Sequence, residues 1–209
     1  MRFQLIACNG LYQEFCRAAA LAAPQLDVSF LPPPCCGGST ALQEQIDQID
    51  SMDRTETPID AILIGCGLCG IGEEGIVSRR YPMVVPRAHD CAALLLGSPR
   101  RYREVFEENG GEIAFYAPEL AQQKLLGAVN RLPAGVSTLG CLLPENAPRE
   151  RLAAKALAQA HQLRYREYIR DNAMITGLVS GQWDPALFLT LNPGERCLPS
   201  FTGEILTKI

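Results

Sequence analysis

A short, continuously apolar segment that ends in a glycine-rich turn sets narrow limits on the fold of this chain. Residues 61–64, Ala-Ile-Leu-Ile, carry no polar side chain, as expected of a strand that is covered on both faces. Similar apolar runs alternate along the chain with longer segments of helical periodicity. This alternation is typical of α/β domains with a mostly parallel sheet. We therefore predict an α/β fold with a Rossmann-like, doubly wound sheet.

The apolar pattern also predicts where the elements lie. Strands are expected over residues 3–7, 28–31, 60–64, 83–85, 113–115, 136–139 and 187–191. Helices are expected around residues 11–19, 40–49, 91–96, 120–131 and 147–172. No linker rich in Gly, Ser or Pro separates independent domains, so we expect one domain over residues 1–209. A weak junction near residue 132 suggests two lobes, 1–132 and 133–209, of which the second is the smaller.

Charge and hydropathy exclude several classes of protein. The net charge is −4 and the calculated pI is 5.3, which argues against a nucleic-acid-binding surface. No apolar run approaches the 18 residues or so that a membrane span needs. The N-terminus lacks the long apolar region of a signal peptide, so we expect a cytoplasmic protein. A homo-oligomer is compatible with this sequence.

Nine cysteines are more than packing usually requires in a chain of 209 residues. In a reducing compartment such thiols serve metal ligation, redox chemistry or burial rather than a disulfide framework. Most of them follow predicted strands, and the carboxyl ends of parallel strands meet at one edge of the sheet, where α/β folds bind ligands. The residues placed there are Cys8, Cys35, Cys36, Cys66, Cys69, His89 and Cys91.

Two of these segments have the spacing of a metal site. Cys66 and Cys69 form a CxxC, which lets two thiolates bind one ion from a tight turn, and His89 and Cys91 add an imidazole and a third thiolate. We predict Cys66, Cys69, Cys91 and His89 as ligands, with Cys8, Cys35 and Cys36 as alternates. The cofactor would be a zinc, cobalt or nickel ion, or an iron–sulfur cluster if Cys8 or Cys35 replaces His89.

Other interpretations of the same residues stay open. Cys8, Cys16 and Cys141 have the character of small core residues, and the CxxC could be a thiol–disulfide site. The turn Gly37-Gly38-Ser39 leads into a helix, so its backbone amides could bind a phosphate. Arg87, with the pair Arg79 and Arg80, could hold an anion at the same edge.

Several segments resemble the family defined as domain of unknown function 1638. They are Cys66-Gly67-Leu68-Cys69-Gly70, residues 82–91 from Pro82 to Cys91, Leu94-Leu95-Leu96-Gly97-Ser98, and residues 177–184 from Gly177 to Asp184 with Phe188 and Asn192-Pro193-Gly194 beyond them. The resemblance implies a bacterial or archaeal cytoplasmic protein of unassigned activity, often associated with corrinoid-dependent methyl transfer. It implies no catalytic residues, and the Asp-x-His-x-x-Gly pattern of cobalamin ligation does not occur in the chain.

Together these observations leave two main classes of function. The first is a metal-dependent enzyme that transfers methyl groups or transforms a small molecule. The second is a non-catalytic carrier of a metal or cofactor that serves a partner, such as a corrinoid protein or methyltransferase. A thiol–disulfide redox protein that uses the CxxC is a further alternative.

Overall fold

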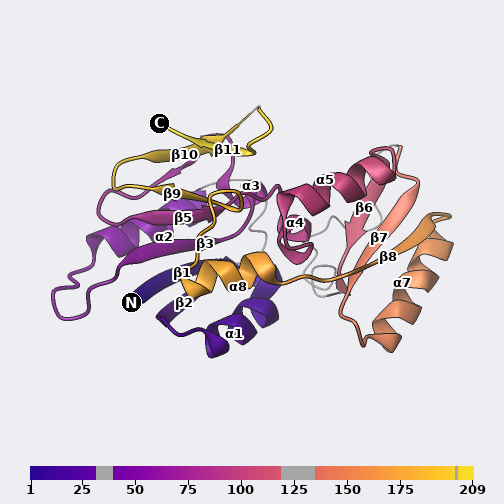
Figure 1. The fold of residues 1–209 in the computed structure, drawn as a ribbon, viewed down its shortest axis with the longest axis horizontal. Helices are drawn as coiled ribbons and strands as arrows, with labels where there is room; N and C mark the ends of the chain where they lie inside the picture. The colour runs from indigo at the N-terminus through magenta and orange to yellow at the C-terminus, as the bar shows by residue number, and fades with distance from the viewer. Residues whose placement is uncertain (32–39, 119–134, 201) are drawn as a thin grey trace.

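The computed structural model describes residues 1–31, 40–118, 135–200 and 202–209. Within these residues the central sheet has the strand order β2-β1-β3-β5-β9 (Figure 1). Its strands are β1 (Arg2–Cys8), β2 (Gln25–Leu31), β3 (Ala61–Gly65), β5 (Met83–Pro86) and β9 (Phe188–Leu191). The first four are parallel, and β9 pairs antiparallel with β5. The prediction of a mixed α/β fold with a mostly parallel sheet is confirmed.

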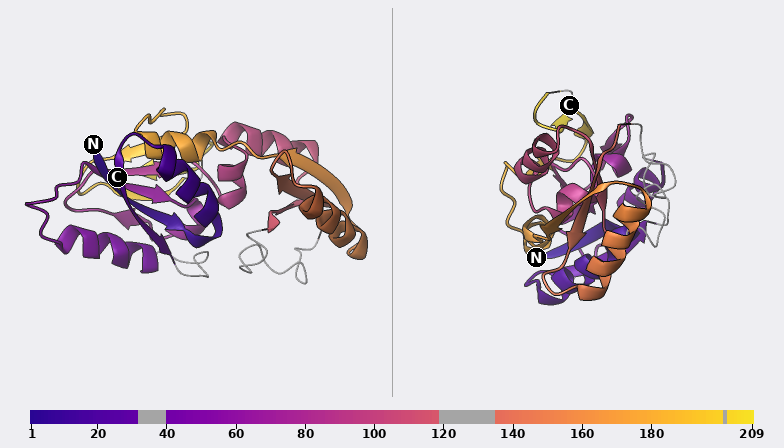
Figure 2. Two further views of the ribbon diagram at one scale, coloured as in Figure 1. Left: turned by 90° about the horizontal axis from the view of Figure 1, so that it is seen from below. Right: turned by 90° about the vertical axis from the view of Figure 1, so that its right-hand side faces the viewer.

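Helices lie on both faces of this sheet. Helices α1 (Tyr12–Leu21) and α8 (Ala173–Ser180) pack together on one face, and α2 (Thr40–Ser51) lies on the other (Figures 1 and 2). Because both faces are covered, every residue of β3 is buried. The predicted helix faces are buried as well, since Phe15 on α1 and Ile46 on α2 are both 0% exposed.

The other elements form a second sheet and a small third one. The second sheet is parallel and consists of β6 (Ile113–Tyr116), β7 (Thr138–Leu143) and β8 (Arg164–Ile169), with the helices α5 (Pro99–Glu108) and α7 (Pro148–Ala160). The third contains β4 (Ile76–Val77), β10 (Arg196–Pro199) and β11 (Leu206–Lys208). The short helices are η1 (Asn9–Leu11), α3 (Leu68–Ile71) and α4 (Cys91–Leu95). None of the described helices is long and apolar enough to cross a membrane.

The second sheet contains strands from both sides of the junction suggested near residue 132. Residue 132 falls between β6 and β7, which pair with each other. We use the term second lobe for the described residues between 99 and 170, which contain this sheet with α5 and α7. It lies beside the central sheet along the long axis of the molecule (Figure 1).

The helix predicted over residues 147–172 is wrong in its second half. Helix α7 ends at Ala160, and residues 164–169 form β8. Gln162 adopts a left-handed conformation with φ of 55°, and the amide of Leu163 bonds back to the carbonyl of Ala158 at 2.9 Å. The tyrosines of β8 have strand propensity, and pairing with β7 overrides the helical spacing of the preceding segment. The predicted helix over 120–131 lies outside the described residues.

We call the part of the molecule that contains the central sheet the first lobe. The chain passes between the first and the second lobe at two neighbouring segments. The amide of Asp171 donates to the carbonyl of Leu95 at 2.8 Å. Gly97 has a φ of +79°, and a Cβ there would lie 2.6 Å from Cγ of Asp171. Only glycine fits this crossing without strain or collision.

Candidate thiol site

Three neighbouring strands of the central sheet bring cysteines to one edge. Cys8 is the last residue of β1, Cys66 and Cys69 follow β3, and Cys91 follows β5 as the first residue of α4. The order β1-β3-β5 in the sheet makes these strand ends adjacent. The short helices α3 and α4, which carry Cys69 and Cys91, lie between the central sheet and the second lobe (Figure 1).

Cys91 is the centre of the thiol cluster. Its Sγ atom lies 3.6 Å from Sγ of Cys8. A hydrogen bond with the Cys69 thiol, then one with the Cys8 thiol, and then burial raise the pKa of Cys91 well above its usual range. Cys8 and Cys91 are buried, whereas Cys69 is half-buried. The cluster is therefore a set of three thiols of which one is accessible from outside.

Backbone contacts hold the CxxC loop against the turn that precedes Cys91. The amide of Leu68 donates to the carbonyl of Ala88 at 2.8 Å, and the amide of Cys69 donates to the carbonyl of His89 at 3.1 Å. A Cβ at Gly67 would lie 2.8 Å from the amide nitrogen of Asp90. Glycine at this position permits the close approach that brings Cys69 to Cys91.

Asp90 fixes the start of the helix that carries Cys91. Its Oδ1 accepts from the amides of Ala92 and Ala93 at 2.9 and 3.0 Å, and its Oδ2 accepts from the hydroxyl of Tyr102 at 3.3 Å. Burial raises the pKa of Asp90, and the three hydrogen bonds offset part of this shift. The pKa of Tyr102 is also raised. Burial is the largest cause, the neighbouring Asp90 carboxylate is the next, and Cys69 contributes least.

The remaining predicted ligands that the structure describes are His89 and Cys66. The imidazole of His89 is exposed and packs against the ring of Tyr102 at 5.3 Å, while Cys66 is buried in the core directly after β3. In the described parts of the chain, no group of three or more His, Cys, Asp or Glu side chains is placed so that it could hold a metal ion. Cys35, Cys36, Gly37, Gly38 and Ser39 lie outside the described residues.

Two other cysteines have the character of core residues. Cys141 lies within β7 in the apolar core of the second lobe, and Cys197 lies on β10. Burial is the main cause that raises the pKa of each thiol to about 12. Cys16, on α1, is half-buried. None of the three follows a strand of the central sheet.

We expect these two core cysteines to react with an alkylating reagent much more slowly than an accessible thiol does. A thiol with a pKa of about 12 is ionised in only about one molecule in 10,000 at pH 8, and the thiolate is the reactive form. In folded protein at pH 8, iodoacetamide should therefore modify Cys141 and Cys197 at least about a hundredfold more slowly than Cys16. Peptide mass spectrometry gives the rates, with urea-unfolded protein as the control. Similar rates for Cys141 and Cys16 in folded protein would contradict the burial described here.

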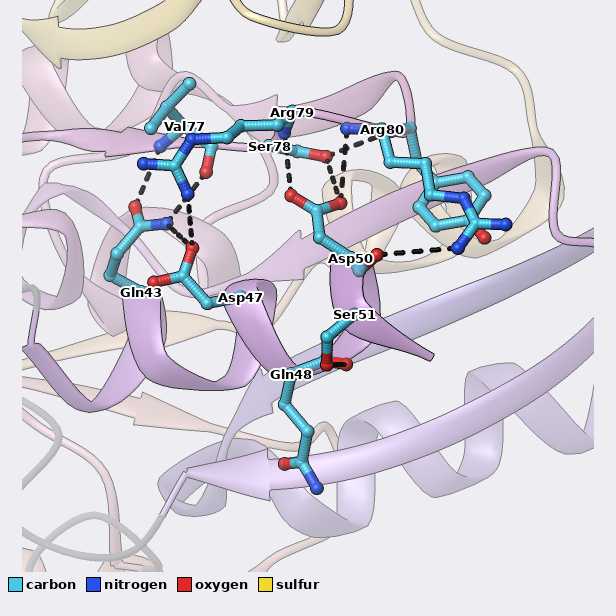
Figure 3. A network of polar contacts seen from close by, with 10 residues as sticks. Gln43, Asp47, Gln48, Asp50, Ser51, Val77, Ser78, Arg79 and Arg80 are labelled. Atoms are coloured by element: carbon cyan, nitrogen blue, oxygen red, sulfur yellow. Dashed lines mark hydrogen bonds and ion pairs between the residues drawn. The ribbon is translucent and has the colours of Figure 1, made fainter. Parts of the chain in front are cut away.

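The arginines of the predicted anion site make contacts within the protein. Arg87 donates from Nη1 to the carbonyls of Glu204 and Leu206, each at 2.9 Å, and it lines a cavity of about 210 Å³ beside the C-terminal segment. The amide of Arg79 binds the carboxylate of Asp50, and its guanidinium binds that of Asp47, both on α2 (Figure 3). Arg80 donates to the carbonyl of Met52 at 2.7 Å. These three side chains fasten the C-terminal segment and the end of α2.

Sequence reasoning did not find Tyr102. It lies on α5, in a segment that is separated from the cysteine motifs, and its role depends on a contact between two lobes. Asp90 was visible because it lies within the His89-Asp90-Cys91 segment. No spacing rule would have connected it with Tyr102.

The comparisons with known proteins give a family but no activity. No curated protein and no solved structure matches the chain. A family model described as a protein of unknown function (DUF1638) matches residues 39–170. This segment is more than half of the chain and contains the CxxC, Asp90, Cys91 and Tyr102. The protein therefore belongs to the DUF1638 family.

Proposed function

We propose that the thiols of Cys8, Cys69 and Cys91 bind a thiol-preferring metal centre. The centre would be a zinc, cobalt or nickel ion, or an iron–sulfur cluster, since thiolates are the ligands that these centres share. Reduced cysteines in such number suit the reducing cytoplasm that we expect for this protein. The observation that carries the proposal is the convergence of three thiols from three strand ends, two of them 3.6 Å apart.

This spacing fits the geometry of thiolate ligation. In a tetrahedral site with Zn–S bonds of about 2.3 Å, neighbouring sulfur atoms lie about 3.8 Å apart. Cys8 and Cys91 are already close to this separation. Cys69 contacts Cys91. No three described side chains are arranged to hold a metal ion in this structure, so binding would require the Cys69 side chain to move toward the other two thiols.

Three thiolates would leave a fourth position for another ligand. Closed structural zinc sites have four protein ligands, whereas catalytic sites have three and keep one position open. The imidazole of His89 lies exposed against Tyr102. A metal ion with an open position supplies Lewis-acid chemistry, and it would suit transfer of a methyl group to or from a small-molecule thiol or a corrinoid partner. A carrier that delivers the metal to a methyltransferase would use the same three ligands.

The contact between Cys8 and Cys91 also favours a second candidate, a thiol–disulfide switch. Forming the disulfide removes one proton from each thiol and passes two electrons to an oxidant such as a small-molecule disulfide, which is reduced to two thiols. Both sulfur atoms are buried, at 1% and 4% exposure of their residues. An oxidant would therefore react first at the half-buried Cys69, which contacts Cys91.

Elemental analysis of anaerobically purified protein tests the metal site. We expect about one zinc, cobalt or nickel ion per chain, or iron with sulfide and visible absorption if a cluster is bound. The metal should be lost in the double variant Cys8→Ser, Cys91→Ser and in Cys69→Ser, since each removes ligands from the cluster. Cys16→Ser, on α1 outside the cluster, is the matched control and should keep the metal.

The same preparations separate the two candidates. Metal-free wild-type protein from repeated anaerobic preparations, or full metal content in the Cys8→Ser, Cys91→Ser variant, would overturn the metal site. If such metal-free protein is then treated with a small-molecule disulfide, a Cys8–Cys91 disulfide in non-reducing peptide mass spectra would support the switch. Circular dichroism of each variant confirms that it is folded.

A further inference from the structure

The turn that carries Cys91 is held by a side chain of the second lobe. Oδ2 of Asp90 accepts a hydrogen bond from the hydroxyl of Tyr102 at 3.3 Å, while Oδ1 caps α4 through two backbone amides. Both carboxylate oxygens of Asp90 are thus engaged. Without the tyrosine hydroxyl, one oxygen of a half-buried carboxylate would lose its donor, and such a loss favours displacement of the side chain.

Displacement of this turn would affect two thiols together. Cys91 directly follows Asp90, and the amide of Cys69 is bound to the carbonyl of His89 at 3.1 Å. At Gly67 the backbone of the CxxC loop packs directly against the backbone of Asp90, so closely that a Cβ would lie 2.8 Å from the Asp90 amide nitrogen. The position of Asp90 therefore sets where Cys69 and Cys91 lie relative to each other.

Tyr102 itself is fixed by the second lobe. Its ring packs against Phe115 of β6 with a centroid distance of 5.1 Å. Helix α5, which carries Tyr102, is bound to β8 by a 2.9 Å hydrogen bond from Asn109 to the hydroxyl of Tyr168. A shift of the second lobe relative to the central sheet would therefore move the tyrosine hydroxyl relative to Asp90.

We propose that Tyr102 is a positioning residue of the thiol site, whose hydroxyl holds Asp90 and thereby fixes the spacing of Cys69 and Cys91. Through this contact the second lobe controls the geometry of the cluster. The expected change in the spacing of Cys69 and Cys91 follows from these contacts alone. The expected change in metal affinity rests on the proposed function as well. Side chains that orient ligands in this way are commonly worth 10–100-fold in metal affinity.

Tyr102→Phe tests this role, with Tyr165→Phe as a matched control. The control removes a hydrogen bond of the same kind, from the Tyr165 hydroxyl to Glu167 at 2.8 Å, within the second lobe. In metal-free protein we expect Tyr102→Phe to change the rate of Cys69 alkylation by iodoacetamide at least about threefold. Tyr165→Phe should stay within about twofold of wild type.

Cobalt titration provides the second measurement. Tyr102→Phe should weaken Co²⁺ binding by about 10–100-fold and shift the sulfur-to-cobalt charge-transfer band, while Tyr165→Phe should leave both unchanged. Wild-type behaviour of folded Tyr102→Phe in alkylation, and in cobalt binding where Co²⁺ binds, would overturn the positioning role. Failure of wild-type protein to bind Co²⁺ would count against the proposed metal site alone, because alkylation of Cys69 still decides the role of Tyr102.

Discussion

Replacing Arg170 by alanine is expected to lower the free energy of unfolding by about 3–5 kcal/mol. Nη1 of Arg170 donates to Oε1 of Glu14 at 2.7 Å, and its Nε donates to the carbonyl of Leu142 at 3.0 Å. The two charged side chains are only 7% and 5% exposed. Removing the guanidinium would leave the carboxylate of Glu14 buried without its counter-charge, which costs far more than the net stability of the intact pair.

Two comparisons show whether burial is the cause. Arg100→Ala removes one partner of the exposed pair with Glu104, whose side chains are 88% and 44% exposed, and should cost less than about 1 kcal/mol. The double substitution Glu14→Leu, Arg170→Met should recover most of the lost stability, because it removes both buried charges. Urea denaturation gives the free energies. A cost below about 1 kcal/mol for Arg170→Ala would refute the assignment of a tightly buried pair.

The ion pair of Glu14 and Arg170 connects the two lobes. Glu14 lies in the first turn of α1, next to the central sheet, and Arg170 follows the last strand of the second lobe. The pair therefore fastens the two lobes close to the segment where Asp171 crosses between them. Oε2 of Glu14 has no hydrogen-bond partner among the described residues, so Arg170 supplies the main compensation for its charge.

The central sheet could be predicted because its signals are local. An apolar run such as residues 61–64 indicates a buried strand without knowledge of its neighbours, and the structure contains β3 there. The segment 164–169 carries no such signal, since arginine and glutamate alternate with tyrosine. Its strand exists because β7 supplies the backbone partners. Local periodicity in the sequence does not show which distant segments pair with each other.

The candidate site could be predicted only in part for the same reason. Parallel strands place their carboxyl ends at one edge, so the position of Cys8, Cys69 and Cys91 followed from the strand assignments. The strand order β1-β3-β5, which brings the thiols of Cys8 and Cys91 together, is a long-range property. Tyr102 depends on the placement of a second lobe against the first, and one sequence contains no local pattern for such a contact.

A second large effect is expected where α1 packs against the strands that carry the thiols. The side chain of Phe15 is 0% exposed, and its ring is so close to Gly65 that a Cβ there would lie 2.7 Å from Cζ. Phe15→Ala would leave a cavity beneath β3 and should cost about 3–5 kcal/mol of unfolding free energy in urea denaturation. Phe106→Ala, at a side chain that is 41% exposed on α5, is the control and should cost at most about 1 kcal/mol.

A double-mutant cycle with Gly65 shows whether the ring supports this strand end. In the wild type, Gly65→Ala places a methyl group against the Phe15 ring and also 2.8 Å from Cβ of Ala7, so we expect it to destabilise the protein. In the Phe15→Ala background the first collision disappears, and the same substitution should cost less. Contacting residues couple by about 0.5–3 kcal/mol in such cycles. Additive effects of the two substitutions would mean that the ring does not press on β3, the strand that leads directly to Cys66.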